Sequence, residues 1–354
     1  MDFLANLKIS EKNIKLINAI IARVKRDFKQ DIDLIGLTGS LNTDDIHDRS
    51  DIDLIIISNN NKAGRFSVSF ILDDVGYDFN SISWGKAEEM ATLESRYTTC
   101  LVDLKILYVA NQTALDRFNT LKESALKKLS EPIGVNCIER ANKLIQLAKI
   151  DYAEIMLSDN VSSARYFSGC LIRNLITCIA HMNNNYIKRG VKRFLEEMSV
   201  YEYLPENFNT LYFGVIESKN ISEIKIASEA ILIAVINLHN ALKCKHFVQP
   251  IPTSENLKRL YEKCWCNYKN KTMDSVEKND KAYAFHVAVS AQKYFNNLPN
   301  ICGIQRFDLM QYFDPNNLNA FKQAFLKAMC EILSEYRKVG LSVEQFSDFY
   351  ELNI

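Results

Sequence analysis

The sequence predicts an α+β protein in which a small mixed-sheet domain is followed by a mainly α-helical region. Two short apolar runs, 34–37 and 51–57, and an alternating run at 66–72 have the length and period of β-strands. Only 11 glycines and 6 prolines occur in 354 residues, and this scarcity of chain breakers favours long helices. From Gly134 onward, apolar residues recur with a helical period almost throughout.

The first 130 residues are predicted to mix strands and helices. Ser10 is a typical N-cap for a helix that continues to about residue 28. A helix at 86–97, a strand at 104–108 and a helix at 114–129 complete this part. Its other strands are predicted at 34–37, 51–57, 66–72 and 77–82, the last two forming a hairpin about a turn at 73–76.

Two breaks divide the chain into three predicted domains. The segment 130–134, with its proline and glycine, ends the first domain at residue 130, and Pro250 and Pro252 mark the second break. The predicted domains are therefore 1–130, 131–250 and 251–354, the last two helical. In the middle domain we expect helices at about 135–158, 162–188, 190–199, 206–217 and 221–244.

A glycine–serine pair and two aspartates form the most informative motif. Gly39 and Ser40 end a buried strand, and Asp51 and Asp53 follow after ten intervening residues. Side chains alternate along a strand, so these two carboxylates face the same way, about 6–7 Å apart. Mg²⁺ is bound by one or two carboxylates together with water and phosphate oxygens. The backbone at Gly39 allows close approach, and Ser40 can donate its hydroxyl and N–H to a phosphate.

Asp78 is predicted to be a third carboxylate of this site. It lies on a hairpin strand between aromatic residues that face the other way. If that strand pairs beside 51–57, Asp78 joins Asp51 and Asp53. Three carboxylates can hold two metal ions, which activate an attacking oxygen and stabilise a leaving pyrophosphate.

The combined pattern resembles the nucleotidyltransferase superfamily, which has a polymerase β-like fold. The resemblance is carried by Gly39, Ser40, Asp51, Asp53 and Asp78. The stretch 73–90 and the strand 104–108 look like the kanamycin nucleotidyltransferase branch, and the motif spacing is also similar to the small MNT antitoxins. The segment 41–48 departs from the pattern, because it lacks the glycine often found there and is unusually acidic.

The resemblance implies transfer of a nucleoside monophosphate from an NTP, expected to be ATP, to an acceptor hydroxyl with two Mg²⁺ ions. In the kanamycin branch a carboxylate on the first helix of the helical domain is the general base. The candidates on that helix are Glu139, Asp151 and Glu154, and Asp151 fits best by its distance along the chain from the strand 104–108. The alternative interpretation of these residues is a solvated helix face.

The acceptor is predicted to be a small molecule, such as an aminoglycoside-like antibiotic, bound by the helical region. Two other functions stay open. One is an MNT-type protein nucleotidylase that modifies a partner protein, although those modules are short and single-domain. The other is a non-catalytic, nucleotide-binding scaffold that retains the carboxylates for metal.

The charge balance argues against a polynucleotide partner. Lys and Arg number 43, and so do Asp and Glu, whereas binding of a nucleic acid backbone draws its affinity from a basic surplus. No window of 18 uncharged apolar residues predicts a membrane span. The absence of a signal-like N-terminus and the irregular spacing of the nine cysteines indicate a reducing, cytoplasmic setting. A homodimer stays open.

Three further groups of residues are predicted to be structural. The pairs Cys244/His246 and Cys264/Cys266 lack the spacing of a structural zinc site. His181 and His239 lie in apolar helices and are expected in the core. The basic cluster 186–193 is predicted to cap a helix C-terminus, where cations are favourable, rather than to contact nucleic acid.

Overall fold

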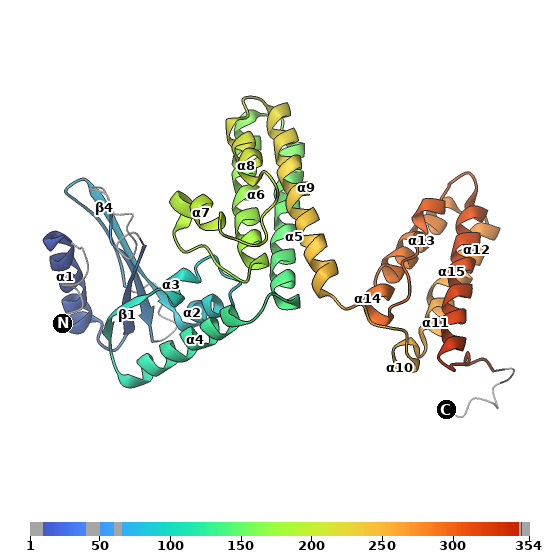
Figure 1. Cartoon of the computed structure of the whole chain (residues 1–354), viewed down its shortest axis with the longest axis horizontal. Helices are drawn as coiled ribbons and strands as arrows, with labels where there is room; N and C mark the ends of the chain where they lie inside the picture. The colour runs from blue at the N-terminus through green and yellow to red at the C-terminus, as the bar shows by residue number, and fades with distance from the viewer. Residues whose placement is uncertain (1–9, 40–49, 60–65, 347, 349–354) are drawn as a thin grey trace. The chain divides into compact units, whose positions relative to one another are not determined.

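The computed structural model describes residues 10–39, 50–59, 66–346 and 348 (Figure 1). The chain divides into two compact units, residues 1–247 and residues 248–354. The first unit contains a sheet domain followed by a helical bundle, and the second unit is helical. Each unit has its own buried core.

A five-stranded mixed sheet forms the centre of the N-terminal domain. Its spatial order is β3-β4-β2-β1-β5. β2 pairs antiparallel with β1 and parallel with β4, so the sheet contains strands that run in both directions. This arrangement confirms the α+β prediction. The strands are β1 (Ile32–Thr38), β2 (Asp53–Ser58), β3 (Ser67–Leu72), β4 (Val75–Ser83) and β5 (Lys105–Val109).

Helices cover both faces of this sheet (Figure 1). The helix α1 (Glu11–Asp27) begins at Ser10, whose hydroxyl accepts from the Asn13 N–H as predicted, and it buries Ile17 and Val24 against one face. The opposite face is covered by three helices that share a second apolar cluster with it. They are α2 (Trp84–Ala91), α3 (Thr99–Val102) and α4 (Gln112–Ser130).

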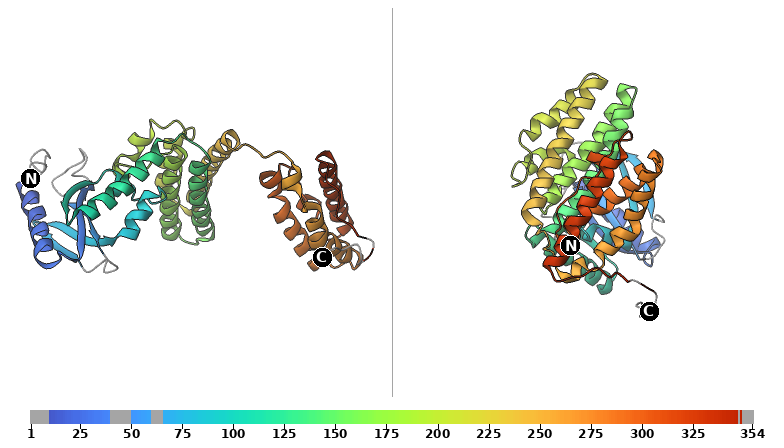
Figure 2. Two further views of the ribbon diagram at one scale, coloured as in Figure 1. Left: turned by 90° about the horizontal axis from the view of Figure 1, so that it is seen from below. Right: turned by 90° about the vertical axis from the view of Figure 1, so that its right-hand side faces the viewer.

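A helical bundle follows the sheet domain within the first unit. Three long helices lie side by side in it, α5 (Val135–Leu157), α6 (Val161–Met182) and α9 (Ile221–His246) (Figure 1, Figure 2). Two shorter helices, α7 (Gly190–Met198) and α8 (Phe208–Glu217), complete it. Its core is almost entirely aliphatic and aromatic, as the helical period of the sequence predicted.

The second unit is built from short helices and one long helix. Phe295, Phe321 and Phe325 are fully buried in its core. Among the described residues, no helix of either unit is long and apolar enough to cross a membrane. The elements are α10 (Ser254–Leu257), α11 (Leu260–Cys264), the π-helix η3 (Trp265–Lys269), α12 (Asn270–Glu277), α13 (Lys281–Phe295), α14 (Leu298–Cys302), the 3-10 turn η4 (Met310–Tyr312) and α15 (Leu318–Lys338).

Two predicted helices end earlier in the structure than the sequence suggested. The helix predicted over 86–97 ends at Ala91, and Leu93 takes a positive φ of 66°. The helix predicted over 162–188 ends at Met182, because Asn184 adopts the left-handed conformation with φ 45°. The Asn184 amide then donates to the carbonyls of Lys128 and Glu131, which ties the loop to the end of α4. Asparagine tolerates this conformation better than most residues do.

The core position predicted for His181 has a consequence for stability. His181 is 2% exposed, and burial, together with the nearby Arg140 guanidinium, lowers its pKa from 6.5 to about 4. Below pH 6.5 the unfolded chain therefore takes up a proton at this residue that the folded chain does not. We expect the free energy of unfolding to fall on acidification, by about 1 kcal/mol between about pH 6 and pH 5 from this group.

Urea unfolding of the wild type and of His181→Leu, measured across this pH range, tests the expectation. The Leu variant should lose less stability on acidification, because it has no proton to take up there. An identical loss in both proteins would contradict a buried, neutral His181.

Candidate active site

Two of the three predicted carboxylates, Asp53 and Asp78, arise from the neighbouring strands β2 and β4. Asp53 begins β2, opposite Thr38 at the end of β1. β2 and β4 pair with Ile56 beside Ser81. Asp53 lies three residues before Ile56 on β2, and Asp78 lies three residues before Ser81 on β4. Both side chains are exposed, whereas their neighbours Leu54 and Phe79 are buried against α1. Strand alternation therefore directs Asp53 and Asp78 to the same face of the sheet, on the pairing that the prediction for Asp78 required.

Asp51 precedes the strand instead of belonging to it. The strand predicted to begin at Asp51 begins at Asp53, and Asp51 is half-buried. Ile52, between the two aspartates, is buried in the core beneath α1. Anchoring Ile52 in this way fixes the backbone on both sides of it, so Asp51 and Asp53 are held next to each other at the strand entrance.

Gly39 lies against the carboxylate of Asp53. Its φ is +74°, which L side chains rarely adopt, and a Cβ at this position would overlap the Asp53 carboxyl group. Only glycine satisfies both requirements. The end of β1 and the start of β2 therefore form one unit, in which the backbone turn and the carboxylate are in contact. Ser40, the partner of Gly39 in the motif, lies outside the described residues.

The Asp78 carboxylate is oriented by its neighbours. The Ser69 hydroxyl donates to one of its oxygens, and the Asn80 amide donates to the other at 2.9 Å. A carboxylate offers about four lone-pair positions, so these two bonds leave acceptor capacity on both oxygens. Asp78 is thus held in place and still able to bind a cation.

The carboxylates at the start of β2 fit a Mg²⁺ ion that takes its remaining ligands from water and phosphate better than a metal ion held by protein side chains alone. Among the described residues, no three His, Cys, Asp or Glu side chains are close enough together to hold a metal ion. Mg²⁺ ordinarily takes one or two carboxylates and completes its octahedron with water and phosphate oxygens. Asp51 and Asp53, at the start of β2, can supply these carboxylates.

A cavity of about 560 Å³ opens beside Gly39 and Asp53. Cavities of this size bind single small molecules. Its walls come from the end of β1, the segment 96–100, the helix α6 and the segment 187–194. A second cavity, of about 380 Å³, also reaches Thr38 and Gly39 and is lined by Lys105 of β5. The two cavities share Lys188 and Arg189.

The basic cluster 186–193 is not a helix C-terminal cap, and that prediction is wrong. Because α6 ends at Met182, the cluster forms a loop and the first turn of α7, and it lines both cavities. Glu197 accepts from the backbone N–H groups of Lys188 and Arg189 and fixes the loop. The Tyr186 hydroxyl donates to Asp103 at 2.8 Å, and burial, then this bond, raises the tyrosine pKa.

The sequence did hold a signal for this segment. Lys192 and Arg193 occupy the first turn of a helix, where the macrodipole disfavours cations. No side chain caps that helix end. Cations at this unfavourable helix end are a sequence signal for a role other than capping, but the helix bounds alone do not place the segment at a cavity.

Cys100 also lines the larger cavity, but its thiol is not activated. Burial raises its pKa, the Asp53 charge raises it further, and a hydrogen bond with Thr38 opposes the rise. The thiol is therefore protonated near neutral pH and is a packing group beside the carboxylate rather than a nucleophile.

The structure does not bring Asp151 to the cavity. Asp151 lies on α5 and accepts from the Asn174 amide of α6 at 2.7 Å, and burial raises its pKa. The α6 residues that do line the cavity are Arg173, Ile176 and Thr177. Among the described residues that form the cavity wall, none belongs to α5. The role of Asp151 as a general base stays a prediction.

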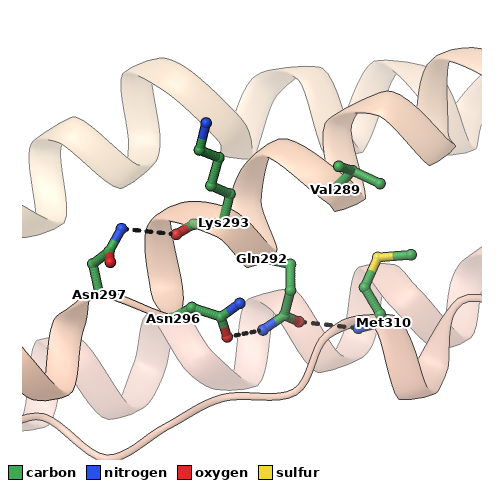
Figure 3. A pocket seen from close by; sticks show the side chains of 6 residues that line it. All are labelled: Val289, Gln292, Lys293, Asn296, Asn297 and Met310. Carbon is green, nitrogen blue, oxygen red and sulfur yellow. Dashed lines mark hydrogen bonds between the residues drawn. The ribbon is translucent and has the colours of Figure 1, made fainter. Parts of the chain in front are cut away.

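A cavity of about 470 Å³ in the second unit is lined by polar side chains that have a structural role. Figure 3 shows Gln292 of α13 reaching from the helix toward Met310. The Gln292 amide donates to Asn296 and to the Phe307 carbonyl, both at 2.8 Å, and accepts from the Met310 N–H at 3.1 Å. Its polar atoms therefore hold the 307–310 loop against α13.

The comparisons with known proteins bear on the sheet domain. Residues 17–124 match the model of the nucleotidyltransferase domain family, a segment that contains Gly39, Asp51, Asp53 and Asp78. The chain thus carries a nucleotidyltransferase domain, and the predicted enzyme class is confirmed. The match does not separate the kanamycin nucleotidyltransferase branch from the MNT branch.

A solved nucleotidyltransferase-like protein from Exiguobacterium sibiricum 255-15 is similar to the chain. The sequence identity is 12%, the alignment covers 65% of this chain and 74% of that chain, and the TM-score is 0.36. No curated protein has a significant match to the chain.

Proposed function

We propose that this protein transfers a nucleoside monophosphate from an NTP, with ATP the first candidate, to a hydroxyl group of a small acceptor. The observation that carries the proposal is the contact between Gly39 and the Asp53 carboxylate, in the wall of a cavity that is also lined by cations. A glycine turn that admits a phosphate, next to a carboxylate that binds a cation, is what binding of a metal–triphosphate complex requires.

The carboxylates are proposed as the metal ligands. Asp51 and Asp53 would hold one Mg²⁺. Asp78, which Ser69 and Asn80 hold on the same face of the sheet, is proposed for a second ion, although the three carboxylates do not form one cluster in this structure. When bound, two such ions lower the pKa of the attacking hydroxyl and neutralise charge on the leaving pyrophosphate. The chain itself positions the reacting groups, and positioning together with charge stabilisation by metal accounts for most of the catalysis in reactions of this kind.

Ser40 is proposed to donate to a phosphate oxygen. Ser40→Ala should weaken the affinity for Mg·NTP by about 1.5–3 kcal/mol, the contribution of one hydrogen bond to a charged group. Titration calorimetry with the non-hydrolysable analogue α,β-methylene-ATP measures this difference. An unchanged affinity in the variant would remove Ser40 from the phosphate site. Ser162→Ala is the matched control, because Ser162 is an exposed serine of α6 outside both cavities, and it should bind as the wild type does.

The acceptor is proposed to occupy the larger cavity, whose walls combine the sheet domain with the helical bundle. The kanamycin nucleotidyltransferase resemblance suggests an antibiotic-like acceptor and Asp151 as the proton acceptor, although Asp151 lies outside the wall of this cavity and is bonded to Asn174. The alternatives are a protein acceptor, as for MNT enzymes, and a scaffold that binds nucleotide without turnover.

Incubation of the full chain with ATP labelled at the α-phosphate and Mg²⁺ separates these functions. Label on a small hydroxyl compound, with release of pyrophosphate, supports the proposal. Label on protein alone favours the nucleotidylase. Binding of Mg·ATP without any pyrophosphate release, over a broad acceptor panel, favours the scaffold.

A further inference from the structure

The larger cavity beside Asp53 carries a surplus of positive charge. Three cations line this cavity but not the smaller one, Arg96, Arg173 and Lys192, which we call the large-cavity cations. Lys188 and Arg189 add two more that the cavities share. Among the described residues of the wall, Asp53 is the single carboxylate.

The charge of the large-cavity cations is available to a ligand. All three side chains are exposed, and none forms an ion pair with a described carboxylate, whereas Arg189 and Arg193 pair with Glu196. They come from three different segments, the α2–α3 connection, α6 and α7. Like charges converging on one cavity repel each other, and a concave wall focuses their field. Binding of an anion would relieve this repulsion.

The triphosphate does not require these three residues. The smaller cavity also reaches Gly39, and Lys105, Lys188 and Arg189 line it. It therefore provides cations beside the glycine turn, where the proposed function puts the phosphates. The large-cavity cations are left for the second substrate. Ile176 and Phe194, in the same wall, offer apolar surface for a ring.

We infer that the acceptor is a small anionic hydroxyl compound, in the simplest case a phosphate monoester, and not a polycationic aminoglycoside. The inference rests on the proposed function and names its second substrate class. In the reaction, the acceptor hydroxyl oxygen forms a bond to the α-phosphorus of the NTP. The bond from that phosphorus to the oxygen bridging to the β-phosphate breaks, pyrophosphate leaves with the electron pair, and the hydroxyl proton passes to solvent or a base.

The test measures binding to the nucleotide complex of the full chain. Protein saturated with Mg²⁺ and α,β-methylene-ATP is titrated by calorimetry with ribose 5-phosphate, with neutral ribose and with kanamycin. We expect ribose 5-phosphate to bind. Ribose should bind at least tenfold more weakly, because it loses about one charge-assisted hydrogen bond. Kanamycin should not bind, because its positive charges would face the large-cavity cations. Arg173→Gln and Lys192→Gln should each weaken the phosphate ester about tenfold or more.

Lys149→Gln is the matched control, because Lys149 is an exposed lysine of α5 outside both cavities. It should leave all affinities unchanged. The inference is overturned if kanamycin binds as well as ribose 5-phosphate, or if the phosphate ester does not bind. It is also overturned if the Arg173 and Lys192 variants lose affinity for Mg·α,β-methylene-ATP instead, since these residues would then hold the triphosphate.

The same experiment also separates a polynucleotide acceptor from a failure of the proposed nucleotide site. Salt-sensitive binding of a short RNA, without binding of ribose 5-phosphate, would replace the small acceptor by a polynucleotide and overturn the inference. Failure of the wild-type chain to bind Mg·α,β-methylene-ATP at all would overturn the proposed function itself. Intact nucleotide binding without a response to the phosphate ester overturns the acceptor class alone.

Discussion

Replacing Asp53 with asparagine should abolish nucleotidyl transfer while leaving the fold intact. The substitution removes the charge of a proposed metal ligand that lies in contact with the Gly39 turn. Loss of the several kcal/mol that a metal ion provides to the transition state corresponds to a rate lower by about a thousandfold. The side chain is exposed, so its core neighbours Ile52 and Leu54 are untouched. Initial rates of pyrophosphate release measure the effect, and thermal unfolding followed by circular dichroism reports on the fold.

Asp74→Asn is the matched control for this variant. Asp74 is an exposed aspartate in the β3–β4 turn of the same sheet, and its positive φ of 59° is tolerated by asparagine. It should retain wild-type activity. If Asp53→Asn also retains it, Asp53 is not a metal ligand. If Asp53→Asn unfolds, Asp51→Asn tests the other proposed ligand of the same ion.

Gly39→Ala should have the second largest effect. The new Cβ would overlap the Asp53 carboxyl group, and the positive φ of Gly39 is strained for alanine. The strain costs about 1–2 kcal/mol, and the displaced carboxylate should slow transfer by about a hundredfold, as shifts of about 1 Å at a reacting centre do. Gly39→Val should be worse, because its branched side chain needs more room. Rates of pyrophosphate release and calorimetric Mg·NTP affinities measure both effects.

The control for the glycine variant lies in the same sheet. A Cβ at Gly76 of β4 would meet nothing within 4 Å, and its φ is not in the left-handed region. Gly76→Ala should therefore behave as the wild type. A Gly39→Ala enzyme as fast as Gly76→Ala would show that the contact with Asp53 has no part in catalysis.

The sheet half of the site could be predicted from the sequence because its determinants are local. The alternation at 51–57 and 77–82 fixes which residues share a face, and this placed Asp53 and Asp78 on the same side of the sheet. The spacing of Gly39 and Asp53 reflects one antiparallel strand pair. The prediction for Asp78 depended on one non-local fact, the parallel pairing of β2 with β4, which the sequence could only state as a condition.

The helical half could not be predicted in the same way. A helical period identifies the apolar face of a helix, but it does not show which of the polar residues line a cavity. Arg173 and Asn174 are adjacent on α6, yet Arg173 lines the cavity and Asn174 turns toward Asp151 of α5. The basic segment was assigned to the wrong end of a helix because the left-handed turn at Asn184 that ends α6 depends on contacts with α4.

The most direct test of the nucleotide site is a crystal structure of the full chain soaked with Mg²⁺ and α,β-methylene-ATP. We predict a metal ion bound by the carboxylates of Asp51 and Asp53, with the triphosphate against the Gly39 backbone and Lys188 or Arg189 at the phosphates. Nucleotide bound away from Gly39, or density for the triphosphate with no cation at Asp53, would contradict the proposed site.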